Sequence, residues 1–265
     1  AMSPSKNAAA RGGGGHGGGK PTHFLAVRLS PASVHLVRKL QTHMGSAYAS
    51  FFVHPQTAHV TLGVIGLYDD ASIDAACMRM EQEVTSLKLG APKLVVGEHV
   101  GGFRKQVLYL GVRDDDNVLQ SLRDAVLPAM HRSASLEAMN NEGSVPPTFT
   151  MDDTYTPHLT VAKASRNRKG AKSARGHKRK KDSEPILWFD ARDTNVEFTP
   201  TAAQPPNPTK PLCLDALGGA TSLAAVLGES AVEEPSELQL CSLFAQKDEE
   251  GYYHVTHRVP FADRL

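Results

Sequence analysis

A four-residue pattern occurs twice in the chain, and its two copies constrain the fold more than any other feature. His59-Val60-Thr61-Leu62 and His158-Leu159-Thr160-Val161 share the order histidine, apolar residue, threonine, apolar residue, and they lie 99 residues apart. Both fall in segments typical of β-strands. Because strand side chains alternate between faces, each histidine shares a face with its threonine. The repeat predicts two related lobes that each contribute one such strand.

The segments around the two copies predict a mixture of strands and helices. Strands are expected at 23–30, 59–67, 93–100, 106–112, 156–163, 237–244 and 252–259. Helices are expected over 31–44, 71–87, 114–139 (interrupted at Leu127-Pro128) and, as a short Gly-broken helix, within 212–232. This order favours an α+β fold in which helices pack against largely antiparallel sheet.

Composition separates a folded body from two irregular segments. The chain has 265 residues, 40% of them hydrophobic, which is enough for a sizeable core. Residues 1–20 are rich in glycine, and we expect them to be disordered. Residues 164–210 contain a basic run and a proline-rich stretch, which indicates a flexible insertion. We therefore expect a single domain over 21–265, interrupted by that insertion.

Charge is concentrated in the insertion. Ten of the 29 lysines and arginines lie within 163–181, where there is no acidic residue, so the rest of the chain is acidic. The basic segment 163–181 could contact an RNA backbone, and its part 176–181 is a nuclear-localisation candidate; a solvated loop is the alternative. No run of 18 apolar residues predicts a membrane span, and residues 1–20 lack the apolar core of a secretory signal.

The cysteines favour a reducing, cytoplasmic compartment. Cys77, Cys213 and Cys241 are odd in number and far apart, which fits neither a disulfide framework nor a zinc site. The histidines and carboxylates show no metal-ligand spacing either, so neither a metal nor a cofactor is expected.

Two tetrad strands placed side by side would set two imidazoles and two hydroxyls around one cleft. Imidazole titrates near neutral pH, so one of His59 and His158 can accept a proton while the other donates one. The hydroxyls of Thr61 and Thr160 can bind the nonbridging oxygens of a phosphate. The pattern predicts acid/base chemistry on a phosphodiester. The alternative is that both histidines are structural residues of a duplicated fold.

Other residues are weaker candidates. Phe24, Phe103 and Tyr155 could stack on a nucleobase, although packing in the core is the common fate of such rings. Arg104 could meet phosphate at the cleft rim or lie in a solvated turn. Simple alternation places Lys163 on the face opposite Thr160, which disfavours it as a ligand.

These motifs resemble those of the 2H phosphoesterase superfamily, which includes the LigT-like families. The segments HFLAVRLS (23–30), GGFRKQVLYLGV (101–112) and TYTPHLTVAK (154–163) are similar to its opening strand, central hairpin and second motif. Residues 237–255 are similar to the closing hairpin of the branch that contains A-kinase anchoring protein 18. The resemblance covers 22–163 and 236–259, and it implies a two-lobed α+β fold with antiparallel sheets flanked by helices around a central cleft.

The resemblance also implies an activity. His59 and His158 would be the acid/base pair, and Thr61 and Thr160 would hold the phosphate. The expected protein is a metal-independent phosphodiesterase for RNA-type bonds, most of all 2′,5′-linked oligoadenylate. The alternatives are a 2′,3′-cyclic nucleotide phosphodiesterase, a 3′-end RNA exonuclease, or a non-catalytic module that binds AMP. The expected ligand is an oligonucleotide or a nucleoside monophosphate.

One part of that branch is not expected in this chain. The anchoring proteins carry an amphipathic helix for a kinase subunit beyond the 2H domain, whereas this chain ends six residues after Val259. Kinase anchoring is therefore not expected.

Overall fold

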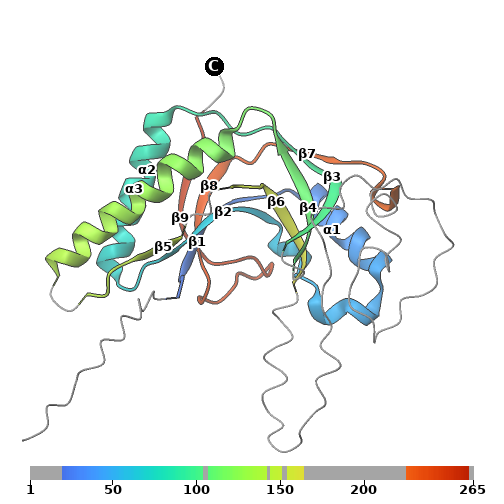
Figure 1. The fold of residues 1–265 in the computed structure, drawn as a ribbon, viewed down its shortest axis with the longest axis horizontal. Helices are drawn as coiled ribbons and strands as arrows, with labels where there is room; N and C mark the ends of the chain where they lie inside the picture. Colours follow the sequence, from blue (N-terminus) through green and yellow to red (C-terminus); the bar gives the residue numbers. More distant parts are fainter. Residues whose placement is uncertain (1–19, 104–106, 142–143, 151–153, 164–224, 263–265) are drawn as a thin grey trace, which may run out of the picture.

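The computed structural model describes residues 20–103, 107–141, 144–150, 154–163 and 225–262, which form one curled sheet flanked by helices (Figure 1). The described strands are β1 (His23–Arg28), β2 (His59–Gly66), β3 (Leu94–Phe103), β4 (Val107–Asp114), β5 (Thr148–Thr150), β6 (His158–Lys163), β7 (Ala231–Glu233), β8 (Glu237–Ser242) and β9 (Val255–Pro260). They follow the order β7-β3-β4-β6-β2-β1-β8-β9, and β5 pairs with β2 outside this path. All named strand pairs in the described part are antiparallel.

The sheet consists of two halves of matching topology. One half runs outward from β6 through β4 and β3 to β7, and the other runs outward from β2 through β1 and β8 to β9. The halves join where Val60 of β2 pairs with Leu159 of β6. The predicted two-lobed α+β fold is confirmed, with the two expected sheets fused into one.

The two central strands share an irregularity of register. Between β1 and β2, the pairing passes from Leu25↔Gly63 to Ala26↔Thr61 and skips Leu62. Between β4 and β6, it passes from Leu108↔Ala162 to Tyr109↔Thr160 and skips Val161. Each tetrad therefore has a β-bulge at its fourth residue, directly after its threonine, and the alternation of faces is reset beyond it.

The helices cover the outer face of the sheet, which is the face opposite the tetrad histidines. They are α1 (Pro31–Met44), α2 (Asp70–Leu87) and α3 (Val118–Asn140), and short 3₁₀ turns lie at Ser46–Phe51 and Pro55–Thr57. Helix α1 begins at the N-cap Ser30, followed by Pro31. The buried carboxylate of Glu233 on β7 accepts hydrogen bonds from the backbone N–H and hydroxyl groups of Ser30 and Ser33, so it joins α1 to the sheet. Helices α2 and α3 pack together over the half that contains β1 and β2 (Figure 1).

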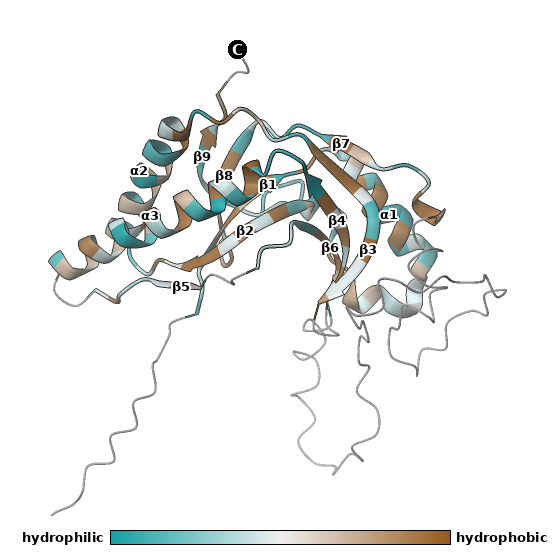
Figure 2. Cartoon of the chain, turned by 45° about the horizontal axis from the view of Figure 1, so that its top comes forward, coloured by the Kyte–Doolittle hydropathy of each residue, from teal (hydrophilic) through white to brown (hydrophobic). Residues whose placement is uncertain are grey.

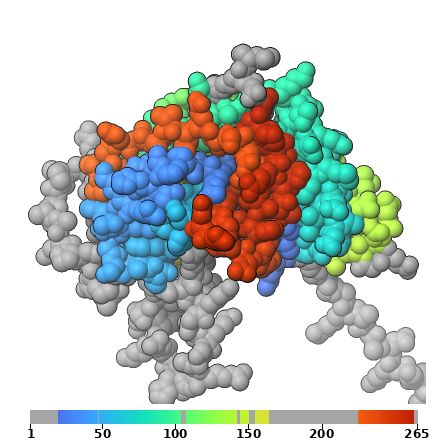
Figure 3. Space-filling model, turned by 180° about the vertical axis from the view of Figure 1, so that it is seen from behind, coloured from blue at the N-terminus to red at the C-terminus, as the bar shows by residue number. Residues whose placement is uncertain are grey.

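The main hydrophobic core lies between the sheet and these helices. Figure 2 shows hydrophobic residues along the helices where they meet the strands. A second, smaller cluster of buried residues, Phe24, Ala26, Cys241 and Tyr252, lies on the inner face of the sheet. Seen from behind, the C-terminal strands pack between the α1 region and α2, so distant parts of the sequence close the fold together (Figure 3).

Two local expectations were wrong. Helix α3 continues through Pro128, because one lost backbone hydrogen bond is tolerated where buried side chains hold the helix, and Leu127 packs against Gly63, where no side chain intervenes. The C-terminal end of the helix expected within 212–232 is strand β7, which pairs with β3.

The predicted tail, most of the insertion and Arg104 lie outside the described residues. No helix in the described ranges is long and apolar enough to cross a membrane.

Candidate active site

The two tetrads meet at the centre of the sheet. Continuing the Val60↔Leu159 pair by one residue in each direction sets His59 opposite Thr160 and Thr61 opposite His158. Because Val60 and Leu159 are buried against the helices, these four side chains share the inner face. The histidines thus occupy one diagonal of a small square and the threonines the other. Neither threonine hydroxyl has a hydrogen-bond partner among the described residues.

Both imidazoles are oriented by the same backbone contact. Nδ1 of His59 lies 2.5 Å from the carbonyl oxygen of Thr57, and Nδ1 of His158 lies 2.8 Å from that of Thr156. A carbonyl only accepts hydrogen bonds, so Nδ1 carries the proton and donates in each ring. This arrangement leaves Nε2 of both rings available for proton transfer.

The surroundings favour neutral imidazoles. The pKa of His59 is lowered to about 4, chiefly by burial, although the hydrogen bond to Thr57 acts in the opposite direction. The positive charges of Lys247 and Lys163, and a proton on His158 when it is present, are part of this lowering. Burial also lowers the pKa of His158, where Lys163 is the neighbouring cation. Both rings are therefore mainly unprotonated at neutral pH, and an anionic ligand would make protonation easier.

Each histidine has its own pair of aromatic neighbours. The ring of His59 lies 5.1 Å from that of Phe24 and 5.5 Å from that of Tyr253. The ring of His158 lies 4.8 Å from that of Phe103 and 5.3 Å from that of Tyr109, centroid to centroid. These rings fix the imidazoles in place and shield one side of each from water.

The aromatic candidates from the sequence have different environments. Phe24 is almost fully buried beside His59, so it supports the histidine and has no open face for a base. Phe103 is only partly buried and stacks on Tyr109, with their centroids 4.4 Å apart and their planes within 21°. Tyr155 packs away from the histidines, under the guanidinium of Arg123 on α3, and its hydroxyl donates to the carbonyl of Thr61.

Lys163 lies on the inner face, contrary to the expectation from simple alternation. The bulge at Val161 pairs Lys163 with Val107 and Thr160 with Tyr109, and Val107 and Tyr109 share a face. Val161 and Ala162 are consecutive and both buried, as expected where a bulge interrupts the alternation of faces. An uninterrupted apolar pair just before the lysine was the only sequence signal for it. Tyr109, Tyr253 and Lys247 were also missed, because their roles depend on tertiary packing.

No metal site accompanies this arrangement in the part of the chain that is described. Within those ranges, no three histidines, cysteines, aspartates or glutamates gather as a metal ion would require. What the four residues can do by themselves is move protons and donate hydrogen bonds to an anion.

The superposition on one solved structure supports the fold, and a second structure is similar to a lesser degree. The structure of Escherichia coli LigT with 3′-AMP superposes with a TM-score of 0.50 at 14% identity, covering 92% of this chain and 99% of LigT. The structure of TT0787 from Thermus thermophilus gives a TM-score of 0.49 at 13% identity, with coverage of 92% and 100%. A comparison with curated proteins gave no match.

The sequence comparison identifies the family. The model of the AKAP7 2′5′ RNA ligase-like domain matches residues 21–201, which is more than half of the chain and includes both tetrads. The chain belongs to the AKAP7 2′5′ RNA ligase-like family of LigT-like 2H phosphoesterases, and it is a phosphodiesterase of that superfamily.

Proposed function

We propose that the protein hydrolyses 2′,5′-linked oligoadenylate by two-histidine acid/base catalysis. The observation that carries the proposal is the diagonal arrangement of two imidazoles, both held through Nδ1, and two unoccupied threonine hydroxyls. A phosphodiester centred on this square has Nε2 of a histidine at each end. The attacking and leaving oxygens of an in-line displacement lie at opposite ends of phosphorus, which fits this spacing.

His59 acts as the base and His158 as the acid in this proposal. With a pKa of about 4, His59 is neutral at pH 7, and two lysines oppose its protonation. The negative charge of the bound phosphate stabilises a proton on His158, where Lys163 is the neighbouring cation. His59 removes a proton from water, the resulting hydroxide attacks phosphorus, and His158 protonates the departing ribose oxygen. Thr61 and Thr160 donate to the nonbridging oxygens.

The adjacent aromatic pair supports a nucleotide substrate. Phe103 is partly exposed beside His158 and is backed by the buried ring of Tyr109, so a base attached to the scissile phosphate can stack on the pair. The family name refers to 2′5′ RNA ligase-like domains, and the structurally similar LigT was crystallised with 3′-AMP. Both facts favour a ribonucleotide with a phosphate on the 2′ or 3′ side.

The free 3′-hydroxyl next to a 2′,5′ linkage offers a second route. Internal attack by this hydroxyl forms a bond from its oxygen to phosphorus, breaks the bond from phosphorus to the 5′-oxygen of the next nucleotide, and leaves a 2′,3′-cyclic phosphate. The enzymatic alternatives, a 2′,3′-cyclic nucleotide phosphodiesterase and a 3′-end exonuclease, use the same four residues. Product analysis separates the two routes on a 2′,5′-linked oligonucleotide, because direct hydrolysis leaves a linear phosphate and internal attack leaves a cyclic one. The choice of substrate separates the enzyme classes.

The test compares three substrates in the presence of EDTA. The protein is incubated with 2′,5′-linked triadenylate, its 3′,5′-linked isomer and a 2′,3′-cyclic nucleotide, and the products are separated by chromatography. The proposal requires cleavage of the 2′,5′ isomer in preference to both others, with loss of turnover in His59→Asn and His158→Asn. Opening of the cyclic nucleotide alone would show that the protein is a 2′,3′-cyclic nucleotide phosphodiesterase instead. Binding of AMP with no turnover of any substrate would leave a regulatory module.

We also propose that the basic segment 163–181 contacts an RNA backbone and that its part 176–181 directs the protein to the nucleus. Of this segment only Lys163 is described by the structure. If the segment binds RNA, the affinity for an oligonucleotide must fall steeply as salt rises, and that dependence must weaken when 166–181 are neutralised.

A further inference from the structure

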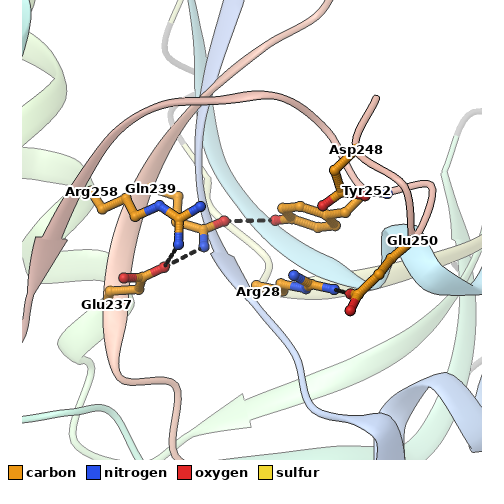
Figure 4. A network of polar contacts seen from close by, with 7 residues as sticks. All are labelled: Arg28, Glu237, Gln239, Asp248, Glu250, Tyr252 and Arg258. Atoms are coloured by element: carbon orange, nitrogen blue, oxygen red, sulfur yellow. Dashed lines mark hydrogen bonds and ion pairs between the residues drawn. The ribbon is translucent and has the colours of Figure 1, made fainter. Parts of the chain in front are cut away.

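The loop between β8 and β9, residues 243–254, is fastened beside His59. Asp248 accepts a hydrogen bond from the backbone N–H of Tyr252 at 2.7 Å, and its own N–H donates to the carbonyl of Tyr252 at 3.0 Å. The hydroxyl of Tyr252 donates to the buried side chain of Gln239 on β8 at 2.9 Å (Figure 4). Arg28 completes the attachment: it bonds to Glu250 at 2.5 Å, and its guanidinium lies 4.4 Å from the centre of the Tyr252 ring.

Arg28 also connects this loop to the reaction centre. It pairs directly with His59 across β1 and β2, so the residue opposite the histidine is the one that holds the loop. The loop returns Tyr253 to the inner face, where its ring lies 5.5 Å from His59 and 4.8 Å from Phe24. The position of Tyr253 is thus determined by the loop and by β1 together.

The ring of Tyr253 in turn contacts the positively charged side chain of Lys247. Nζ of Lys247 lies 4.4 Å from the centre of the Tyr253 ring, a distance at which a cation is attracted to the face of the ring. Tyr253 itself lies beside Phe24 and His59, and Lys247 is close enough to lower the pKa of His59. The lysine therefore lies on the β1 side of the histidine pair, at the end away from Phe103 and Tyr109.

The two halves of the sheet differ at the position that Lys163 occupies in the β6 half. Lys163 stands five residues after His158, and the matching position five residues after His59 is Val64. Val64 and Tyr253 both pack against the small inner-face cluster of Phe24, Ala26, Cys241 and Tyr252. The β6 half of the sheet thus carries its cation on the strand, whereas the β2 half has an apolar residue there and receives its cation from the loop.

We propose that Lys247 forms a second anion subsite, which binds a phosphate next to the scissile one and selects nucleotides that carry at least two phosphate groups. The inference rests on the proposed function, because it presumes that the scissile phosphate lies between His59 and His158. Lys163 and Lys247 then flank that phosphate from the two halves of the sheet. A single ammonium ion on a partly solvated phosphate contributes about tenfold in affinity.

Binding measurements test the subsite without requiring turnover. Isothermal titration calorimetry is carried out on the full chain with adenosine 2′,5′-bisphosphate and with the 2′- and 5′-monophosphates. We expect the wild type to prefer the bisphosphate over the better monophosphate by about tenfold. Lys247→Gln should bring this ratio near one while leaving monophosphate affinity unchanged, and Lys247→Arg should restore it. Lys93→Gln, an exposed lysine next to β3, is the matched control.

Two results would overturn the inference. An equal loss of affinity for all three nucleotides in Lys247→Gln would place Lys247 on the scissile phosphate itself, and an unchanged ratio would mean that it binds no phosphate. Turnover of 2′,5′-linked triadenylate with an unchanged ratio would refute the subsite alone. A Lys247-dependent preference without turnover of any oligoadenylate would support the subsite and refute the proposed function.

Discussion

The β2 half and the β6 half of the sheet hold the same catalytic pattern in different surroundings. Each half positions a histidine, a threonine two residues later and a bulge one residue after that, and each imidazole is held by a carbonyl two residues before it. The neighbouring strand differs, however. Opposite His59 and Thr61 stand Arg28 and Ala26, whereas opposite His158 and Thr160 stand Gly111 and Tyr109.

These differences give the symmetric pair an asymmetric environment. In the β2 half, Arg28 holds a loop beside the histidine, and small Ala26 leaves room for the ring of Tyr252. In the β6 half, Gly111 leaves room for the ring of His99, and Tyr109 forms part of a stacked aromatic pair. The comparison indicates that the two halves share the proton chemistry but divide recognition: one side offers a cation on a fixed loop, the other offers rings.

The largest effect expected is loss of turnover in His59→Asn and His158→Asn. Asparagine keeps a donor near the position of Nδ1 but cannot exchange protons, so kcat for triadenylate should fall by at least about 10³-fold in each. His35→Asn, an exposed histidine of α1, is the matched control and should keep wild-type kcat. Retention of more than a tenth of the activity in either active-site variant would rule out its role in proton transfer.

A change of leaving group should break the symmetry between these variants. A nitrophenyl ester of a nucleotide expels a weakly basic phenolate that needs no proton. If His158 is the acid, His158→Asn should recover most of its activity on this ester, while His59→Asn should remain inactive. The reverse result would exchange the two roles and leave the pair itself intact.

Removal of a threonine hydroxyl should come next in size. Thr61→Val and Thr160→Val keep the shape of the side chain but lose its donor, so kcat should fall by about 100-fold while KM changes little. Because the threonines lie across from each other on one diagonal, the two losses should be similar. A tenfold difference between them would show that the phosphate does not lie at the centre of the square.

The sequence was sufficient to predict the fold class and the four central residues. The tetrads and the helix start at Ser30-Pro31 are local signals, and the observed β2, β6 and α1 agree with them closely. Periodicity recovered most strands for the same reason. It missed β5 and β7, which are three residues long and exist only because a partner strand is there to pair with.

The shell around the histidines could not be predicted in the same way. Lys163 was placed on the wrong face because a bulge resets alternation and leaves little trace in the sequence. Tyr253 and Lys247 reach His59 through a loop nearly 200 residues away in the chain, and no local pattern encodes that approach. The sequence predicts roles that depend on strand alternation, but it does not predict roles that depend on packing between distant segments.

Acidification should destabilise the protein through His59. Its folded pKa of about 4 lies below the value of about 6.5 expected for the unfolded chain, so between these values the unfolded state binds more protons. The stabilisation is therefore complete above about pH 6.5 and is lost as pH falls toward 4. Between pH 7 and 4.5, the wild type should lose about 2 kcal/mol more stability than His59→Asn. Thermal unfolding at both pH values measures this, and His35→Asn should behave as the wild type.

Substitution of Tyr109 tests the recognition side of the comparison. If a base stacks on the pair formed by Tyr109 and Phe103, Tyr109→Ala should lower kcat/KM for triadenylate by about tenfold, because Phe103 loses the buried ring that supports the stack. Tyr109→Phe keeps the ring and should retain wild-type kcat/KM. A loss in Tyr109→Phe equal to that in Tyr109→Ala would assign the effect to the hydroxyl and contradict stacking.

The smallest effect expected is a difference in how the two lysines act on the histidines. A nearby positive charge lowers an imidazole pKa, so its removal must raise that pKa. Lys163→Met should raise the pKa of both His59 and His158, whereas Lys247→Met should raise that of His59 alone. NMR titration of the two rings measures these shifts, and high salt should shrink them. Equal shifts of both rings in Lys247→Met would mean that the loop serves the whole site, and recognition would then not be divided between the two halves of the sheet.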